Sequence, residues 1–104
     1  MKVDPELNAP RPVFDGDELL ALRPDIAGLA RLEVRNLFNM PSEYMGPEQW
    51  VLLQRAVNAE LAREEVAGVI VSHGTDTMEE SAWFLDLTLD SPKPVVLVGA
   101  QRNA

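Results

Sequence analysis

The sequence predicts an α/β fold, a three-layer Rossmann-like parallel sheet, and three observations support this. Two short runs rich in β-branched residues, at 69–71 and 95–98, lie between turn residues, which is typical of buried strands. An amphipathic helical pattern precedes each run. The order of strand, helix, strand, helix and strand favours parallel pairing through right-handed crossovers.

We predict that the chain consists of an N-terminal segment, residues 1–16, and an α/β domain that spans residues 17–104. We predict an irregular N-terminal segment, because prolines fix the backbone and remove hydrogen-bond donors. Residues 17–22 form a short helical turn that ends before Pro24. Residues 31–39 (RLEVRNLFN) alternate apolar and polar side chains at their start, so we expect the first strand there.

Two longer helices follow. Pro47 suits the first position of a helix over residues 47–64, because a proline there loses no hydrogen bond. A second helix begins after residue 77 and ends before Pro92. Two capping boxes, Asp76 with Glu79 and Thr77 with Glu80, are expected at its start. The predicted inner stripes of the two helices are Trp50, Leu53, Val57 and Leu61, and then Met78, Ala82, Leu85 and Leu89.

Composition excludes several classes of function. The formal net charge is −8, from 17 acidic and 9 basic side chains, which argues against nucleic acid or an anionic membrane as partner. The chain has no cysteine and one histidine, so we expect no metal site and no cysteine nucleophile. No apolar run reaches about 18 residues, so no span of a membrane is expected. The absence of cysteine and an N-terminus unlike a secretory signal fit a cytoplasmic protein, and a periplasmic or secreted protein is the alternative if a signal precedes this sequence.

Three segments follow predicted strands and should meet at one edge of the sheet, where open parallel sheets bind ligands. They cover residues 41–45, 72–77 and 99–102. In the middle one, Gly74 permits a tight turn and close approach of the backbone. Thr75 and Asp76 then lie at a helix N-terminus, where free N–H groups can hold an anion.

Structural roles explain several of the same residues. Spacing alone favours Thr75 and Asp76 as helix caps, although capping and function can coexist. His73 fits a structural imidazole packed under the turn better than a general base, because the sequence shows nothing to pair with it. Trp50 and Trp83 fit core or layer packing better than ligand stacking.

Residues 68–102 resemble the asparaginase/glutaminase family. The run His-Gly-Thr-Asp-Thr-Met-Glu-Glu, residues 73–80, is nearly identical to a run that family members carry at the end of a strand. A weaker segment, residues 39–50, is similar to the family's Ser-x-Asp-Met segment, with Tyr44 where the family has aspartate. The resemblance covers about residues 15–104 and implies part of an asparaginase-type N-terminal domain.

The resemblance implies roles for five residues. Thr75 matches a threonine beside the scissile amide, and Asp76 matches an aspartate that binds the substrate's α-amino group; both are predicted catalytic and substrate-binding residues. Ser42 matches the serine that holds the α-carboxylate, Glu43 the neighbour that contacts the α-amino side, and Ala100 a residue whose carbonyl faces the amide. The implied reaction is hydrolysis of asparagine, and sometimes glutamine, without metal or organic cofactor, in a homo-oligomer.

Two expected parts of the family's site are missing from the sequence. The Thr-Gly-Gly-Thr-Ile motif that carries the family's first threonine does not occur, and Lys2 and Lys93, the only lysines, match no family lysine. We therefore expect a truncated, inactive fragment that keeps part of the substrate site, and marginal folding or assembly with another chain. The alternative is a non-catalytic remnant that binds an amino acid or associates with a full-length paralogue. A response-regulator or flavodoxin domain lacks support, because neither clustered aspartates nor a phosphate loop follows an early strand.

Overall fold

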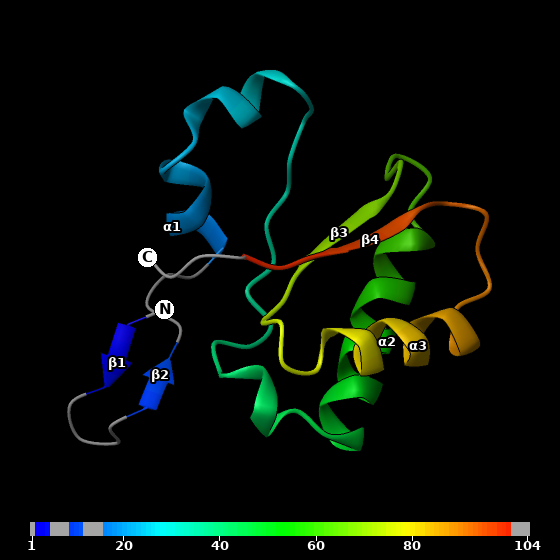
Figure 1. Ribbon diagram of the computed structural model, residues 1–104. Helices are drawn as coiled ribbons and strands as arrows, with labels where there is room; N and C mark the ends of the chain where they lie inside the picture. The colour runs from blue at the N-terminus through cyan, green and yellow to red at the C-terminus, as the bar shows by residue number, and fades with distance from the viewer. Residues whose placement is uncertain (1, 5–8, 12–15, 101–104) are drawn as a thin grey trace. The chain divides into compact units, whose positions relative to one another are not determined.

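The computed structural model describes residues 2–4, 9–11 and 16–100 of the chain, which divides into two compact units (Figure 1). The first unit comprises Met1–Pro41 with Asn103–Ala104, and the second comprises Ser42–Arg102. The division between the units falls after Pro41, whereas the sequence suggested a boundary after residue 16. The assignment of residues 17–104 to one domain stays a prediction.

The first unit begins with a small antiparallel sheet. β1 (Lys2–Asp4) pairs with β2 (Ala9–Arg11), with Val3 opposite Pro10. The prediction that residues 1–16 are irregular is therefore wrong for these two strands. A proline is compatible with a two-stranded sheet because each strand is an edge and has one side without a ladder partner.

Two short helices follow in this unit. α1 (Gly16–Ala21) agrees with the predicted helical turn within one residue, and η1 (Pro24–Gly28) is a 3-10 helix that begins at Pro24. The guanidinium of Arg23 donates two hydrogen bonds to the Asp25 carboxylate, at 3.0 and 2.8 Å. This ion pair lowers the pKa of Asp25, but both groups are solvent-exposed, so its effect on stability is small.

The strand predicted over residues 31–39 is not formed. These residues adopt neither helix nor strand, and apolar side chains among them, such as Leu32 and Leu37, are exposed to solvent. The Asn36 side chain donates from Nδ2 to Asp17 Oδ2, at 3.0 Å. Alternation of apolar and polar residues predicted a strand, but a strand also requires a neighbouring backbone, and no strand of the described residues pairs with this segment.

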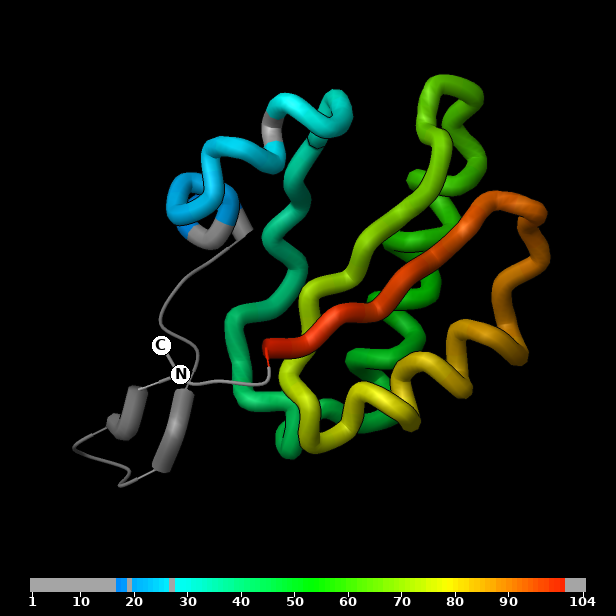
Figure 2. Tube along the Cα trace, turned by 45° about the horizontal axis from the view of Figure 1, so that its top comes forward, coloured from blue at the N-terminus to red at the C-terminus, as the bar shows by residue number. Residues whose placement is uncertain are grey.

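The second unit is built on two parallel strands. β3 (Val69–Ser72) pairs with β4 (Val95–Val98), with Val69 opposite Val95 and Ser72 opposite Val98. α2 (Pro47–Leu61) precedes β3, and α3 (Met78–Thr88) connects β3 to β4. Figures 1 and 2 show both helices on the same side of the strand pair. The α/β class and these four elements confirm the sequence prediction for this part of the chain.

The hydrophobic core lies between the helices and one face of the sheet. Its buried side chains are Leu53, Val57 and Leu61 of α2 and Leu85 of α3, packed against half-buried residues of both strands. On the opposite face, Ile70, Val96 and Val98 expose 68, 50 and 46% of their surface. The two strands are thus buried on one face and not on both. Residues 42–100 form two layers, so the third layer stays a prediction.

The N-terminus of α2 has the sequence features predicted for it. Pro47 occupies the first turn, and the Gly46 N–H donates to Gln49 Oε1 at 2.9 Å, which satisfies one of the unpaired donors of the helix start. No helix of the described segments is both long and apolar enough to cross a membrane.

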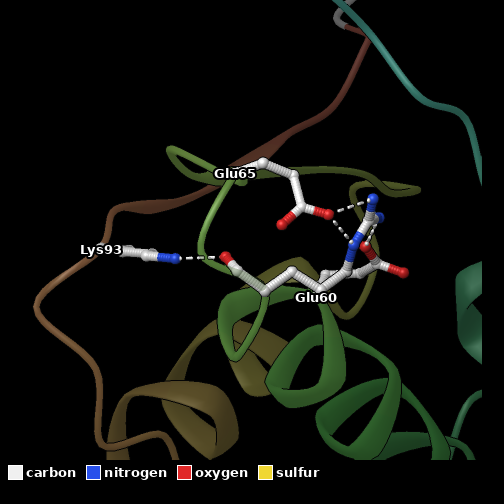
Figure 3. A network of polar contacts seen from close by, with 4 residues as sticks. Glu60, Glu65 and Lys93 are labelled. Atoms are coloured by element: carbon white, nitrogen blue, oxygen red, sulfur yellow. Dashed lines mark hydrogen bonds and ion pairs between the residues drawn. The ribbon is translucent and has the colours of Figure 1, made fainter.

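A network of polar contacts lies at the C-terminal end of α2 (Figure 3). Lys93, in the turn before β4, donates from Nζ to the Arg63 carbonyl at 2.6 Å. The Arg63 guanidinium pairs in turn with Glu60 at 2.7 Å and Glu65 at 2.9 Å. Lys93 therefore joins the end of α2 to the start of β4, at the edge of the sheet opposite the carboxyl ends of the strands.

Replacement of Lys93 by methionine should lower the free energy of unfolding by about 1 kcal/mol, because the apolar stem is kept while the bond to the carbonyl is lost. Thermal unfolding followed by circular dichroism measures the change. The matched control is Arg55→Met, which removes an exposed cation from α2 and should leave the melting temperature unchanged. Equal melting of Lys93→Met and the unaltered chain would contradict the role assigned to Lys93.

Candidate functional site

Three segments distant in sequence converge at the carboxyl ends of β3 and β4. They are the 3-10 helix η2 (Ser42–Tyr44), the turn 73–77 and the residues 99–100 that follow β4. A Cβ atom placed on Gly74 would lie 2.8 Å from Ser42 Oγ, and one placed on Gly99 would lie 2.9 Å from Thr75 Cγ2. Both positions are therefore restricted to glycine by close approach. The convergence predicted from the sequence is confirmed for the described residues, and residues 101–102 of the third predicted segment lie outside them.

Ser42 connects η2 to the turn before α3. Its side chain is buried, and its Oγ accepts hydrogen bonds from the N–H groups of Asp76, at 3.1 Å, and Thr77, at 3.3 Å. The Ser42 carbonyl accepts a third bond from Thr77 Oγ1, at 2.8 Å. Ser42 thus fixes the backbone around Asp76 from outside the helix.

The hydrogen bonds that Ser42 accepts leave its hydroxyl hydrogen as the group that can bind a ligand. A serine hydroxyl has two acceptor lone pairs and one donor hydrogen. Both lone pairs are used by Asp76 and Thr77, so only the hydroxyl hydrogen remains to bind a ligand. A donor beside the N-terminus of α3, where the helix dipole is positive, favours a negatively charged group such as a carboxylate.

The two predicted capping boxes are absent. Thr77 is the N-cap of α3, but its side chain makes no capping bond and instead donates to the Ser42 carbonyl. Asp76 contributes its backbone N–H to Ser42, and its carboxylate is exposed. Ser42, distant in sequence, thus takes the place of the local caps.

The structure brings some of the predicted site residues into contact with one another and leaves others apart. Ser42 and Asp76 are hydrogen-bonded, and Thr75 lies against Gly99. Thr75, Asp76 and Ala100 are exposed to solvent, as a site open to a ligand requires. Glu43 is also exposed and, within the described segments, makes no hydrogen bond or ion pair, so the structure does not join it to the others.

His73 has the structural role predicted for it, although the expectation that nothing pairs with it is wrong. Its Nδ1 lies 2.6 Å from the Gly74 carbonyl oxygen, and its Nε2 lies 2.8 Å from the hydroxyl of Ser81. A carbonyl can only accept, so Nδ1 carries a hydrogen. Ser81 lies on α3 and is fully buried. The two hydrogen bonds of His73 therefore connect the turn to α3. The spacing of eight residues gave no signal for this pair.

The site offers hydroxyls and a carboxylate near the N-terminus of α3. No group of three or more potential metal ligands of the His, Cys, Asp and Glu types occurs in the described part of the chain. A carboxylate can bind an ammonium group, and a hydroxyl donor beside a helix N-terminus can bind a carboxylate. The arrangement therefore suits a small zwitterion, such as a free amino acid.

Comparisons with known proteins agree with the sequence motifs. The family model described as "Asparaginase, N-terminal" matches residues 1–104. A glutamyl-tRNA(Gln) amidotransferase subunit of Methanothermobacter thermautotrophicus is 41% identical over 102 residues, 98% of this chain and 23% of the relative. "Probable L-asparaginase periplasmic" of Haemophilus influenzae is 42% identical over 88 residues, 85% of this chain and 25% of the relative. The chain thus spans about a quarter of the length of the curated relatives that it matches.

Proposed function

Since the chain belongs to the asparaginase family, we propose that residues 42–100 form the substrate-binding part of an amidohydrolase site for asparagine or glutamine. The observation that carries the proposal is the bonding of Ser42 to the backbone of Asp76, directly beside Thr75. It brings a hydroxyl donor, a carboxylate and a second hydroxyl to one end of the sheet.

Each residue then has a chemical task. The Asp76 carboxylate binds the ammonium group of the amino acid, and the Ser42 hydroxyl donates to its carboxylate. The Thr75 hydroxyl faces the side-chain amide, with the Ala100 carbonyl on the other side of the amide and Glu43 near the ammonium group. In the complete reaction water adds to the amide carbon, and the C–N bond breaks to release ammonia.

We further propose that the 104-residue polypeptide binds the amino acid without turning it over. Activation of the Thr75 hydroxyl requires a base, and the resemblance implies a lysine for this purpose. The Lys93 ammonium group instead donates a hydrogen bond to the Arg63 carbonyl, at the amino ends of the strands. The alternative is a non-catalytic remnant that binds an amino acid or a partner protein and associates with a full-length paralogue.

A component of an amidotransferase is the second candidate. Relatives named as amidotransferase subunits in Methanothermobacter thermautotrophicus and Haloquadratum walsbyi align with 98% of this chain, whereas the Haemophilus influenzae asparaginase aligns with 85%. The same binding site would serve either reaction, because both begin at an amide. Ammonia release that begins only when a partner protein is added would favour this candidate.

Calorimetric titration with L-aspartate and L-asparagine tests the binding site. We expect both to bind, and Asp76→Asn to weaken binding about tenfold or more, because a charge-assisted hydrogen bond contributes roughly 1.5–3 kcal/mol. Asp86→Asn, an exposed aspartate within α3, is the matched control and should bind as the unaltered chain does. A titration without heat for either amino acid would refute the proposal. Ammonia release that disappears in Thr75→Ala would refute only the absence of turnover.

A further inference from the structure

The outer face of α3 forms an apolar groove with an acidic rim. Its volume is about 410 Å³, and it is lined by aromatic, aliphatic and acidic side chains. The residues on α3 follow helical spacing, with Trp83 four residues after Glu79 and Leu87 four residues after Trp83. The groove is lined by Trp50, Glu79, Glu80, Trp83, Phe84 and Leu87.

Two large apolar side chains of this groove are exposed. The sequence predicted core or layer packing for Trp83; core packing is wrong, because 66% of its surface is accessible, and the value for Leu87 is 65%. The inner face of α3 is occupied by Leu85, which faces α2 and the sheet. Trp83 and Leu87 line the same groove, and tryptophan is among the residue types enriched in binding hot spots.

Two aromatic residues that line the groove stack on each other and connect α2 to α3. Trp50 of α2 stacks on Phe84 of α3, with ring centroids 6.1 Å apart and an angle of 30° between the planes. The indole Nε1 of Trp50 is shielded from solvent and has no hydrogen-bond acceptor in the described part of the chain. The stacked pair joins α2 to α3, and both rings line the groove, so this part of its lining lies on helices and not on a loop.

The charge around the groove indicates the kind of partner. Glu79 and Glu80 form the rim, and neither carboxylate has an ion-pair partner among the residues described. The sequence contains no lysine or arginine between Arg63 and Lys93. A second copy of this chain would bring further carboxylates, including the exposed Asp86, against this rim, and an anionic membrane would be repelled in the same way.

We propose that this groove binds an amphipathic helix of a partner protein that carries lysine or arginine beside its apolar stripe. The apolar residues of such a helix would lie on Trp83, Phe84 and Leu87, in the way that helices occupy grooves elsewhere. Its cations would pair with Glu79 and Glu80 and can also lie over the exposed face of the Trp83 indole. This surface is separate from the residues assigned to amide hydrolysis and does not depend on that proposal.

The test uses a synthetic helical peptide of about four turns, with leucines at positions i, i+3, i+4 and i+7 and lysines on both flanks. Calorimetry with the purified 104-residue chain should show binding, and Trp83→Ala should weaken it about tenfold or more. Glu79→Gln combined with Glu80→Gln should weaken it several-fold and reduce its dependence on salt between about 0.05 and 0.3 M. A peptide with glutamate in place of each lysine should not bind.

The matched control variant is Leu52→Ala, which removes an exposed apolar side chain of α2 outside the groove lining and should leave binding unchanged. The proposal is overturned if the lysine peptide does not bind, if the glutamate peptide binds equally well, or if Trp83→Ala has no effect. Self-association of the chain that Trp83→Ala abolishes would overturn it in favour of a second copy as occupant.

Discussion

Replacement of Ser42 by alanine is expected to destabilise the second unit and to abolish amino-acid binding. The Ser42 oxygen is buried and accepts from the backbone N–H groups of Asp76 and Thr77. Alanine leaves both donors without this acceptor, and an unpaired buried donor costs about 1–3 kcal/mol. Water that reaches the exposed Asp76 would offset part of this cost, so we expect a loss of about 2–4 kcal/mol in the free energy of unfolding.

Urea unfolding followed by circular dichroism measures the stability of this variant, and calorimetry with aspartate measures binding. The control is Ser91→Ala, since Ser91 Oγ also accepts a backbone N–H, from Lys93 at 3.2 Å, but lies outside the site. We expect that control to lose at most about 1 kcal/mol and to bind aspartate normally. Unaltered stability in Ser42→Ala would contradict the bonding described for this residue. Unaltered binding would remove Ser42 from the substrate site but would leave its structural role intact.

The elements around β3 and β4 were predictable because each has a strong local signal. Pro47 and a regular apolar stripe define α2, and short β-branched runs between turns define the two strands. The prediction of a strand over residues 31–39 was wrong. Alternation of apolar and polar residues indicates that one face of a strand could be buried, but it does not show whether a neighbouring strand pairs with it. For the same reason the sequence suggested strands buried on both faces, whereas α2 and α3 cover one face only.

The candidate site was predictable only in part. The turn 73–77 and its neighbours could be placed at one edge of the sheet from the order of elements alone. The bond from Ser42 to Asp76 joins residues 34 positions apart, so no local pattern could reveal it, and local capping boxes were predicted in its place. His73 and Ser81 are likewise joined through space, across the turn that separates β3 from α3. The exposure of Trp83 escaped prediction because a single apolar residue on a helix fits either face.

Leu85→Ala should have the largest effect on folding. Leu85 exposes 2% of its surface and is the one side chain that α3 contributes to the four-residue buried core. Truncation of a buried leucine costs about 2–5 kcal/mol, because the lost contacts and the resulting cavity both destabilise the native state. Stabilities of small domains are only about 5–15 kcal/mol, and this sheet has one face exposed, so we expect the variant to lose cooperative unfolding near room temperature.

The comparison that isolates this effect is Leu87→Ala, two residues further along the same helix. The chemical change is identical, but Leu87 is 65% exposed, so its removal should alter the free energy of unfolding by about 0.5 kcal/mol or less. Both substitutions change the intrinsic helix propensity by the same amount, in favour of alanine, so the difference between the two variants reports burial. If both variants unfold at the same urea concentration, α3 does not pack on α2 and the sheet through Leu85. The site would then lose its support as well, since Ser81, which binds His73 beneath the turn, lies on the same buried side of α3 as Leu85.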